Sequence, residues 1–386
     1  MTYDYITRSV DRSHSVDLVL FDFSKAFDLV SHGVLLSKLF SIGVRDPLLS
    51  WIRSFLLLRS MRVVVGGRVS EPRPVTSGVP QGSVLGPLLF IIYVNHLPSY
   101  LRNKVQFFAD DLKLYVSFPA DPSEALVLTD QFQVDIDTVV RVSNSWGLVL
   151  NPDKCVQIHF GSSRCAPDAR RYYLNGQQIQ LVGSHRDLGI LVDTSLRFHI
   201  HIKYIVNRAA ALANNLLQTT LCREPDFMRT LYISHIRPLL EFCSPLWNTG
   251  FVGDLQLLES VQRRWTKNVS ALEEKPYGER LLALDLYSVK GRLLRCDLIR
   301  CWKIFNGESV VQPSDLFELP ASHRTRGHCF KVNHVRARLE CRRRSFAIRV
   351  VPLWNNLPES VVISETLNEF KKGLHAVIPD LLYGYV

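Results

Sequence analysis

The chain has 386 residues, 47% of them hydrophobic and 21% charged, and its formal net charge at pH 7 is +10. This length and apolar content can bury substantial cores, which argues against a disordered chain and favours two or three domains. The longest apolar run, residues 84–94, is about half a membrane span, so we expect an intracellular protein without a membrane segment. The eight cysteines are irregularly spaced and no signal peptide is visible, which argues against a secreted disulfide framework.

The first informative element is residues 16–23, an apolar run that Asp22 interrupts. Such a run predicts a buried strand, in which Asp22 occupies a position expected for a core residue. Residues 24–30 leave the strand, and we expect them to open a helix. Asp22 is therefore expected at the end of a strand, where a ligand can reach its carboxylate.

The next segment, residues 31–76, predicts two helices at 33–40 and 47–52, followed by a hairpin around Gly66 and Gly67. Residues 76–90 then carry three regularly spaced glycines and run into an apolar helix. Glycines allow a backbone to approach a ligand closely or to adopt unusual dihedrals. A plain turn before a helix is the alternative for this stretch.

Two adjacent carboxylates, Asp110 and Asp111, interrupt a strand-like aromatic run at residues 107–115. Half-buried carboxylates are costly unless a cation or hydrogen bonds compensate them, and two together repel. If neighbouring strands present Asp22 beside Asp110, their oxygens and a backbone carbonyl suit Mg²⁺, with nucleotide phosphates completing its coordination. A surface turn is the alternative for an isolated Asp-Asp pair.

Three segments occur in a specific order and spacing: residues 21–28 (FDFSKAFD), 77–83 (SGVPQGS) and 108–111 (FADD). Together they closely resemble motifs of the reverse transcriptases of non-LTR retrotransposons, of the jockey and CR1 type. Residues 146–155 resemble the fourth palm motif of that family and residues 186–193 the next one, and the likeness extends over nearly the whole chain.

The resemblance implies an α+β fold, with a right-hand polymerase palm made of an antiparallel sheet and packed helices. It implies an RNA-directed DNA polymerase that adds dNTPs to the 3′-hydroxyl of a DNA primer on an RNA template. The family places finger motifs before the first palm aspartate, whereas only 21 residues precede Asp22. We therefore expect an N-terminally truncated reading frame, and the alternative function is that of an inactive relic that only binds nucleic acid.

The resemblance also implies roles for individual residues. Two Mg²⁺ ions, or Mn²⁺, would be held by Asp22, the backbone carbonyl of Phe23, Asp110 and, more weakly, Asp111. Lys154 would be the acid that protonates the leaving pyrophosphate. Phe27 would exclude a 2′-hydroxyl from the sugar site, although an ordinary core aromatic is the alternative. The template and nucleotide would be contacted by Ser77, Gly78, Pro80, Gln81 and Gly82, and the primer end by Leu188 and Gly189.

We expect three domains: a palm at residues 1–193 with partial fingers at 31–76, a helical thumb at 194–306, and a basic accessory region at 307–386. The accessory region contains an arginine cluster, Arg336, Arg338, Arg342, Arg343 and Arg344. Such a cluster is either a solvated face or a surface that tracks template RNA or target DNA. Nearby zinc-ligand types, at positions 323, 328, 329, 334 and 341, do not match the spacing of a zinc site.

Overall fold

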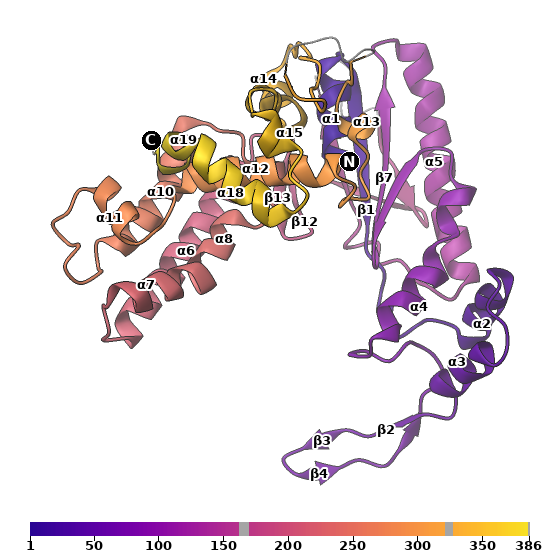
Figure 1. The fold of residues 1–386 in the computed structure, drawn as a ribbon. Coiled ribbons are helices and arrows are strands. Elements are labelled where there is room, and N and C mark those ends of the chain that lie inside the picture. The colour runs from indigo at the N-terminus through magenta and orange to yellow at the C-terminus, as the bar shows by residue number, and fades with distance from the viewer. Residues whose placement is uncertain (162–169, 321–326, 385–386) are drawn as a thin grey trace. The chain divides into compact units, whose positions relative to one another are not determined.

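The computed structural model describes residues 1–161, 170–320 and 327–384, so His323, Arg324 and Arg326 lie outside the described residues. The chain divides into two compact units. We call Ser13–Gly183 the sheet unit, and Met1–Arg12 together with Ser184–Val386 the helical unit. Strands and helices both contribute, which confirms a mixed α+β fold (Figure 1). The division into palm, fingers and thumb stays a prediction.

The sheet unit contains helices and strands in alternation. Its helices are α2 (His32–Ser41), α3 (Leu48–Leu56), α4 (Leu85–Val94), the 3₁₀ turn η1 (Leu97–Tyr100) and α5 (Pro122–Ser145). Its longer strands are β1 (Ser15–Phe21), β6 (Lys104–Phe108), β7 (Asp111–Phe118) and β8 (Val156–Phe160). Its short strands are β2 (Ser60–Met61), β3 (Val64–Val65), β4 (Arg68–Val69), β5 (Arg73–Pro74), β9 (Tyr173–Leu174), β10 (Gln177–Gln178) and β11 (Gln180–Leu181).

The main sheet has the strand order β11-β8-β1-β7-β6. Strand β1 is central and antiparallel to both neighbours, because it pairs with β7 and β8, whereas β11 is parallel to β8. Alternation along the strands directs Val19, Phe21, Leu112 and Leu114 to one face, where they join a core with buried side chains of α2, α4 and α5. The buried face of the sheet thus fixes the register of β1 against β7.

Several expected elements of this unit are confirmed. Helices α2 and α3 and the β3–β4 hairpin occur where the sequence predicts them, and Figure 1 shows the β2–β5 ribbon projecting beyond α3. The apolar run at residues 84–94 is the core helix α4. Within the described ranges, no helix is both long and apolar enough to cross a membrane.

Two expectations about local structure are wrong. Residues 107–115 are not one strand but a β6–β7 hairpin, because Phe108 pairs with Asp111 and leaves Ala109 and Asp110 as its two-residue turn. Ala109 adopts the left-handed conformation, with φ 53°. The turn lacks the glycine or asparagine that usually signals such a conformation in the sequence. Residues 24–28 form turns instead of a helix, and α2 begins only at His32 after the N-cap Ser31.

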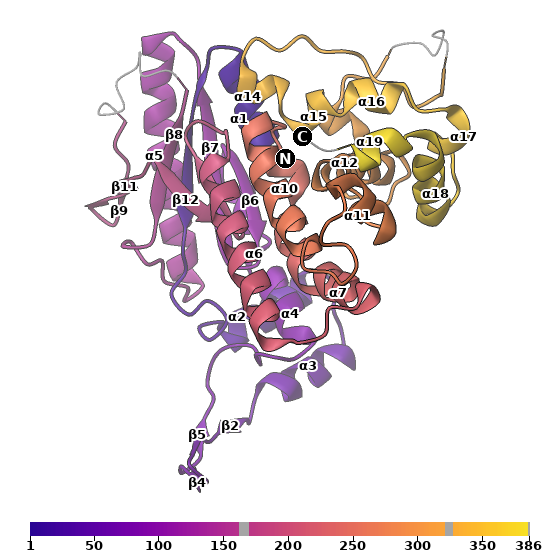
Figure 2. The same cartoon turned by 90° about the vertical axis from the view of Figure 1, so that its left-hand side faces the viewer.

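The helical unit begins with α1 (Thr2–Asp11) and resumes with the hairpin strands β12 (Ser184–Asp187) and β13 (Ile190–Asp193). Its larger helices confirm the expected helical character of residues 196–306 (Figure 2): α6 (His199–Thr219), α7 (Pro225–Leu231), the π-helical turn η3 (Tyr232–Ile236), α8 (Arg237–Glu241), α9 (Ser244–Trp247), α10 (Val252–Thr266), α11 (Tyr277–Ala283) and α12 (Val289–Phe305). Shorter helices follow: α13 (Pro313–Leu316), α14 (Glu340–Arg343), α15 (Phe346–Arg349), α16 (Val351–Asn355), α17 (Glu359–Val362), α18 (Leu367–Val377) and α19 (Pro379–Tyr383).

The C-terminal short helices pack on α12 around an aromatic core. Trp302 stacks on Phe370 and Phe305 on Trp354, with ring centroids 5.6 and 5.3 Å apart. Both tryptophans are almost fully buried. Burial of these large rings stabilises a segment whose helices are too short to be stable alone.

Candidate active site

The strand register brings the three predicted aspartates to the same end of two neighbouring strands in the sheet unit. Phe21, the last residue of β1, pairs with Leu112, so Asp22 follows at the level of Asp111. Asp110 is the preceding residue, in the turn of the adjoining β6–β7 hairpin. Asp22 and Asp110 therefore lie just beyond neighbouring strands at the same end of the sheet, as the sequence predicts. Since Asp110 lies in a turn, strand alternation does not separate it from Asp111.

The backbone around Asp22 is held by the segment before β8. The Asn151 N–H donates to the Asp22 carbonyl, and the Ser24 N–H donates to the Val149 carbonyl, both at 2.8 Å. These two bonds flank a bridge between Phe23 and Leu150, so they do not use the carbonyl of Phe23 itself. The segment before β8 thus holds the backbone of Asp22 in place. The Phe23 carbonyl, which is the predicted metal ligand, takes no part in these two hydrogen bonds.

The carboxylate of Asp22 is only partly compensated. Its Oδ2 atom is buried and accepts no hydrogen bond from the described residues, and it forms an ion pair with the Nζ atom of Lys154 at 3.4 Å. The Lys154 side chain is 65% exposed, so this ion pair is well solvated and weak. An oxygen in this state has coordination capacity that the protein itself does not use. The structure also places Lys154 beside the carboxylate, as its expected role in the same site requires.

The glycine-bearing loop lies against the turn that follows Asp22. The N–H groups of Gly78 and Val79 donate to the carbonyls of Val30 and Phe27 at 2.8 and 2.9 Å. These bonds engage the carbonyls of residues 27 and 30, so pairing with the loop replaces the helix expected there. Gly78 has φ +85°, and a Cβ atom added to it would lie 2.8 Å from the Asp28 carbonyl oxygen. This glycine therefore serves close packing of two backbone segments.

Two polar side chains of the loop make contacts within the protein. The Ser77 hydroxyl donates to the Asp28 carbonyl at 2.8 Å, and Gln81 Nε2 donates to Asp28 Oδ1 at 2.9 Å. The buried side chain of His32 lies with its Nε2 atom 2.8 Å from the Gly78 carbonyl. The loop is thereby held at the end of β1, and contact of Ser77, Gly78, Pro80, Gln81 and Gly82 with template and nucleotide stays a prediction.

Phe27 is half-buried and stacks on Phe90 of α4, with ring centroids 4.5 Å apart. It packs against the margin of the core and keeps part of its ring accessible. This position is compatible both with a core aromatic and with a wall of the sugar site.

The residues expected to grip the primer form the turn of the β12–β13 hairpin in the helical unit. Leu188 and Gly189 both have positive φ, 46° and 88°, which is the conformation of a type I′ hairpin turn. Leu188 is 39% exposed. A rigid turn thus presents the predicted primer-grip residues, whose role stays a prediction.

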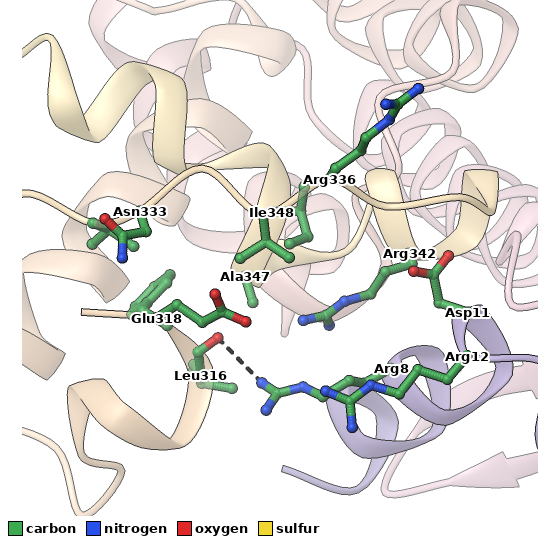
Figure 3. A pocket seen from close by; sticks show the side chains of 13 residues that line it. Arg8, Asp11, Arg12, Leu316, Glu318, Asn333, Arg336, Arg342, Ala347 and Ile348 are labelled. Atoms are coloured by element: carbon green, nitrogen blue, oxygen red, sulfur yellow. Dashed lines mark hydrogen bonds between the residues drawn. The ribbon is translucent and has the colours of Figure 1, made fainter. Parts of the chain in front are cut away.

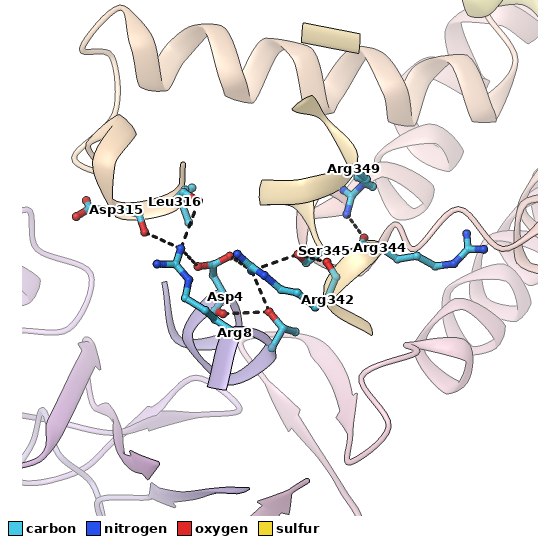
Figure 4. Close-up of polar contacts among 9 residues, drawn as sticks. Asp4, Arg8, Asp315, Leu316, Arg342, Arg344, Ser345 and Arg349 are labelled. Carbon is cyan, nitrogen blue, oxygen red and sulfur yellow. Dashed lines mark hydrogen bonds and ion pairs between the residues drawn. The ribbon is translucent and has the colours of Figure 1, made fainter. Parts of the chain in front are cut away.

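The five arginines of the C-terminal cluster do not form one exposed surface. Arg342 is buried and lies 2.5 Å from Asp4 of α1 (Figure 4). Arg344 pairs with Glu340 and donates to the Thr249 carbonyl. Arg338 donates to the Asp11 carbonyl at 3.2 Å. Arg336, Arg338 and Arg343 are exposed. Binding of nucleic acid by this cluster stays a prediction, and the buried Arg342 is not part of the cluster's exposed portion.

One polar cluster was not predicted from the sequence. Asp17, in the middle of β1, is fully buried; its Oδ1 lies 2.6 Å from His159 Nδ1, and its Oδ2 accepts a hydrogen bond from the Tyr172 hydroxyl at 2.8 Å. Arg170 lies 3.6 Å from the same oxygen. Burial, and then the charge of Asp17, raise the pKa of Tyr172. The partners are remote in sequence, and only the polar residue in an apolar strand could have drawn attention to this position.

The sequence also did not predict that Cys155 contacts Asp22. Its buried Sγ atom accepts a hydrogen bond from the Asp22 N–H at 3.5 Å, and burial raises the pKa of the thiol to about 11. The thiol therefore stays protonated at neutral pH and acts as a neutral packing group behind Asp22.

Comparison with known proteins agrees with this geometry. Residues 6–190 match the family model of reverse transcriptase (RNA-dependent DNA polymerase). A probable RNA-directed DNA polymerase from transposon BS of Drosophila melanogaster is 26% identical over 307 residues, which cover 75% of this chain and 33% of that protein. The RNA-directed DNA polymerase from the mobile element jockey of the same species is 30% identical over 48% of this chain and 20% of its own length.

A retrovirus-related Pol polyprotein from the type-1 retrotransposable element R2 of Popillia japonica is 27% identical over 84% of this chain and 55% of that protein. Among solved structures, apo telomerase from Candida tropicalis matches 78% of this chain and 52% of its own at 12% identity, with a TM-score of 0.38. The chain spans between a fifth and about half of the length of these curated relatives. Residues 6–190 thus match the reverse transcriptase family, and the sequence comparisons support a reverse transcriptase of the non-LTR retrotransposon kind.

Proposed function

We propose that the chain is an RNA-directed DNA polymerase that transfers dNTPs to a primer 3′-hydroxyl with the help of two divalent metal ions. This proposal depends on one observation: Asp22 lies beside the Asp110-Asp111 turn at one end of the sheet. There Asp22 Oδ2 is buried and accepts no hydrogen bond from the described residues. The match of residues 6–190 to the reverse transcriptase family supports the same assignment.

The residues present fit Mg²⁺. Among the described residues, no group of three or more His, Cys, Asp or Glu side chains is placed so that it could hold a metal ion by itself. Mg²⁺ usually takes one or two carboxylates and completes its shell with water and substrate phosphates, so an incomplete set of carboxylates suits it. Asp22 and Asp110 would hold the ions, with the Phe23 carbonyl and Asp111 as further ligands. When bound, the ions would lower the pKa of the primer hydroxyl and neutralise charge on the triphosphate.

The protein groups around this site would position the substrates. Lys154 would leave its solvated pair with Asp22 and donate a proton to the departing pyrophosphate. The accessible part of Phe27 would contact the sugar of the incoming nucleotide and exclude a 2′-hydroxyl, and its stacking on Phe90 would hold the ring in place. The Gln81 loop would line the template side, because its bonds to Asp28 fix it near Asp22.

The proposal is tested by Mg²⁺-dependent dNTP incorporation on a primed RNA template, measured for the natural chain, Asp22→Ala and Asp110→Asn. We expect incorporation by the natural chain and a loss of about a hundredfold or more in both variants, because each removes a carboxylate that stabilises charge in the transition state. Asp153→Ala is the matched control: Asp153 is exposed, lies in the same segment as Lys154, and its Oδ1 atom accepts a hydrogen bond from Gln177.

Equal activity of the natural chain and Asp22→Ala would contradict the two-metal assignment. Absence of incorporation in every variant, with RNA retained at low salt, would identify a protein that binds nucleic acid and does not polymerise. In that case the alternative function inferred from the sequence would apply.

A further inference from the structure

The helical unit contains a cavity of about 190 Å³ that is lined on several sides by arginines (Figure 3). Its walls come from the end of α1, residues 316–318, residues 332–336 and the helices α14 and α15. All of these segments belong to the helical unit, so the cavity is formed within one compact unit. Its volume equals roughly six water molecules at about 30 Å³ each, which is enough for a small tetrahedral anion and its hydration.

The charged groups that line the cavity are four arginines, Arg8, Arg12, Arg336 and Arg342, and two acids, Asp11 and Glu318. In Figure 3, Arg8, Arg12 and Arg342 gather on one side, whereas Arg336 extends away from them at the rim. Neither Arg12 nor Arg336 pairs with a carboxylate in the part of the chain that the structure describes. Positive charge therefore remains after the internal pairs are formed.

Internal contacts hold two of the arginines in place. Asp4 pairs through one oxygen with Arg8, at 2.9 Å, and through the other with Arg342, at 2.5 Å (Figure 4). Arg8 also donates to the Leu316 carbonyl at 3.3 Å, yet its Nε–H is buried and has no acceptor among residues 1–161, 170–320 and 327–384. A buried guanidinium donor without a partner is costly, and an anion in the cavity would satisfy it.

The negative groups near the cavity are partly neutralised. Asp11 Oδ1 accepts hydrogen bonds from the backbone N–H groups of Arg338 and Leu339 at 2.9 and 2.6 Å. The carboxyl end of α1 would repel an anion, but the Arg338 side chain donates to the carbonyls of Asp11 and Val10 there, at 3.2 and 3.5 Å. Glu318 remains as an acid that opposes an anion and lowers the net positive charge of the cavity.

We propose that this cavity binds a phosphate group, with Arg8 and Arg342 as its fixed donors and Arg12 and Arg336 as its mobile ones. Guanidinium groups are suited to this ligand because their planar donors match the oxygens of a phosphate in pairs. The phosphate belongs either to a nucleic acid chain or to a small phosphate compound. The proposal concerns binding alone and does not depend on polymerase activity.

The test compares two double variants that remove the same charge. Arg12→Gln/Arg336→Gln removes the two cavity arginines that have no carboxylate partner among the described residues. The control, Arg208→Gln/Arg264→Gln, removes two exposed arginines of the same unit that neither line the cavity nor belong to the C-terminal arginine cluster. Binding of inorganic phosphate is measured by calorimetry in chloride buffer at constant ionic strength. Binding of a single-stranded RNA is measured by fluorescence anisotropy at several salt concentrations, without Mg²⁺ or dNTPs.

We expect the cavity variant to bind inorganic phosphate at least about tenfold more weakly, and the control variant to bind it unchanged. If the phosphate belongs to nucleic acid, the cavity variant also loses about two units of the salt dependence of RNA binding, and the control loses less. Loss of phosphate binding with unchanged RNA binding would assign the cavity to a small phosphate compound. Equal phosphate binding by both variants, or none by the natural chain, would overturn the proposal.

Discussion

The middle and the end of strand β1 carry two aspartates in opposite electrostatic states. Asp17 is fully buried, and both of its oxygens have close partners in His159 and Tyr172, with Arg170 nearby. Asp22 lies five residues further along, and its buried oxygen has only a solvated lysine at 3.4 Å. A compensated carboxylate stabilises the fold, whereas an uncompensated one keeps the capacity to bind a cation. The difference separates a structural carboxylate inside β1 from one directly after it, whose role as a metal ligand stays a prediction.

The sharpest test of this comparison exchanges each aspartate for asparagine. Asp17→Asn leaves the buried Arg170 without its counter-charge, and we expect the free energy of unfolding of the sheet unit to fall by about 3–5 kcal/mol. Asp22→Asn breaks only a solvated pair, and we expect a change below about 1 kcal/mol. Native-state hydrogen exchange of β1 and β8 amides measures both, because these strands report opening of the sheet. Similar destabilisation by the two substitutions would show that both carboxylates are structural.

A second test addresses what holds the end of β1 in place. Gly78→Ala puts a Cβ atom 2.8–2.9 Å from backbone atoms of Phe27 and Asp28, in addition to the strain of φ +85°. We expect a loss of about 2–3 kcal/mol in stability, together with weaker dNTP incorporation, because the turn after Asp22 must move.

Gly82→Ala is the matched control for this substitution. Gly82 has a similar φ of +80°, but no atom lies within 4 Å of its added Cβ. It should therefore show only the strain of about 1 kcal/mol. Equal effects of the two alanines, measured by the same hydrogen-exchange experiment, would mean that the contact with residues 27 and 28 is unimportant.

The smallest expected change in stability concerns Lys38, a half-buried cation of the sheet unit. Lys38 Nζ donates to the Tyr93 carbonyl and lies over the Trp146 ring, and burial lowers its pKa to about 7. The unfolded chain binds more protons than the folded one between pH 7 and the ordinary lysine pKa of 10.5. Stability should therefore rise with pH across this window, by on the order of 1–2 kcal/mol after allowance for the partial burial.

Lys38→Met removes the titrating group and keeps most of the side-chain volume. The difference in unfolding free energy between this variant and the natural chain, followed by denaturant titration from pH 7 to 10, should shrink or change sign as the pH rises. A constant difference would show that Lys38 stays protonated in the folded state, held by its contact with the Trp146 ring.

Local patterns accounted for much of the sheet unit. The strand β1, the helices α2 and α4 and the hairpin around Gly66 and Gly67 follow from periodicity and turn residues, which act over a few neighbouring positions. The same local information predicted a helix after Asp22 and a single strand around Asp110, and both predictions were wrong. At those positions the backbone bonds with remote segments, or reverses at an alanine, and neither event leaves a local pattern.

The sequence by itself predicted which residues carry the chemistry, because Asp22, Asp110 and Asp111 stand in motifs whose order and spacing resemble those of the reverse transcriptase family. Only the tertiary structure decided their states. The fold surrounds Asp17 with His159 and Tyr172, whereas an oxygen of Asp22 accepts no hydrogen bond from the described residues. It also packs Gly78 against the turn after β1 and buries Arg342 beside Asp4 of α1. The physical reason is that compensation of a charge depends on which groups surround it in space, and strand register and packing set that neighbourhood.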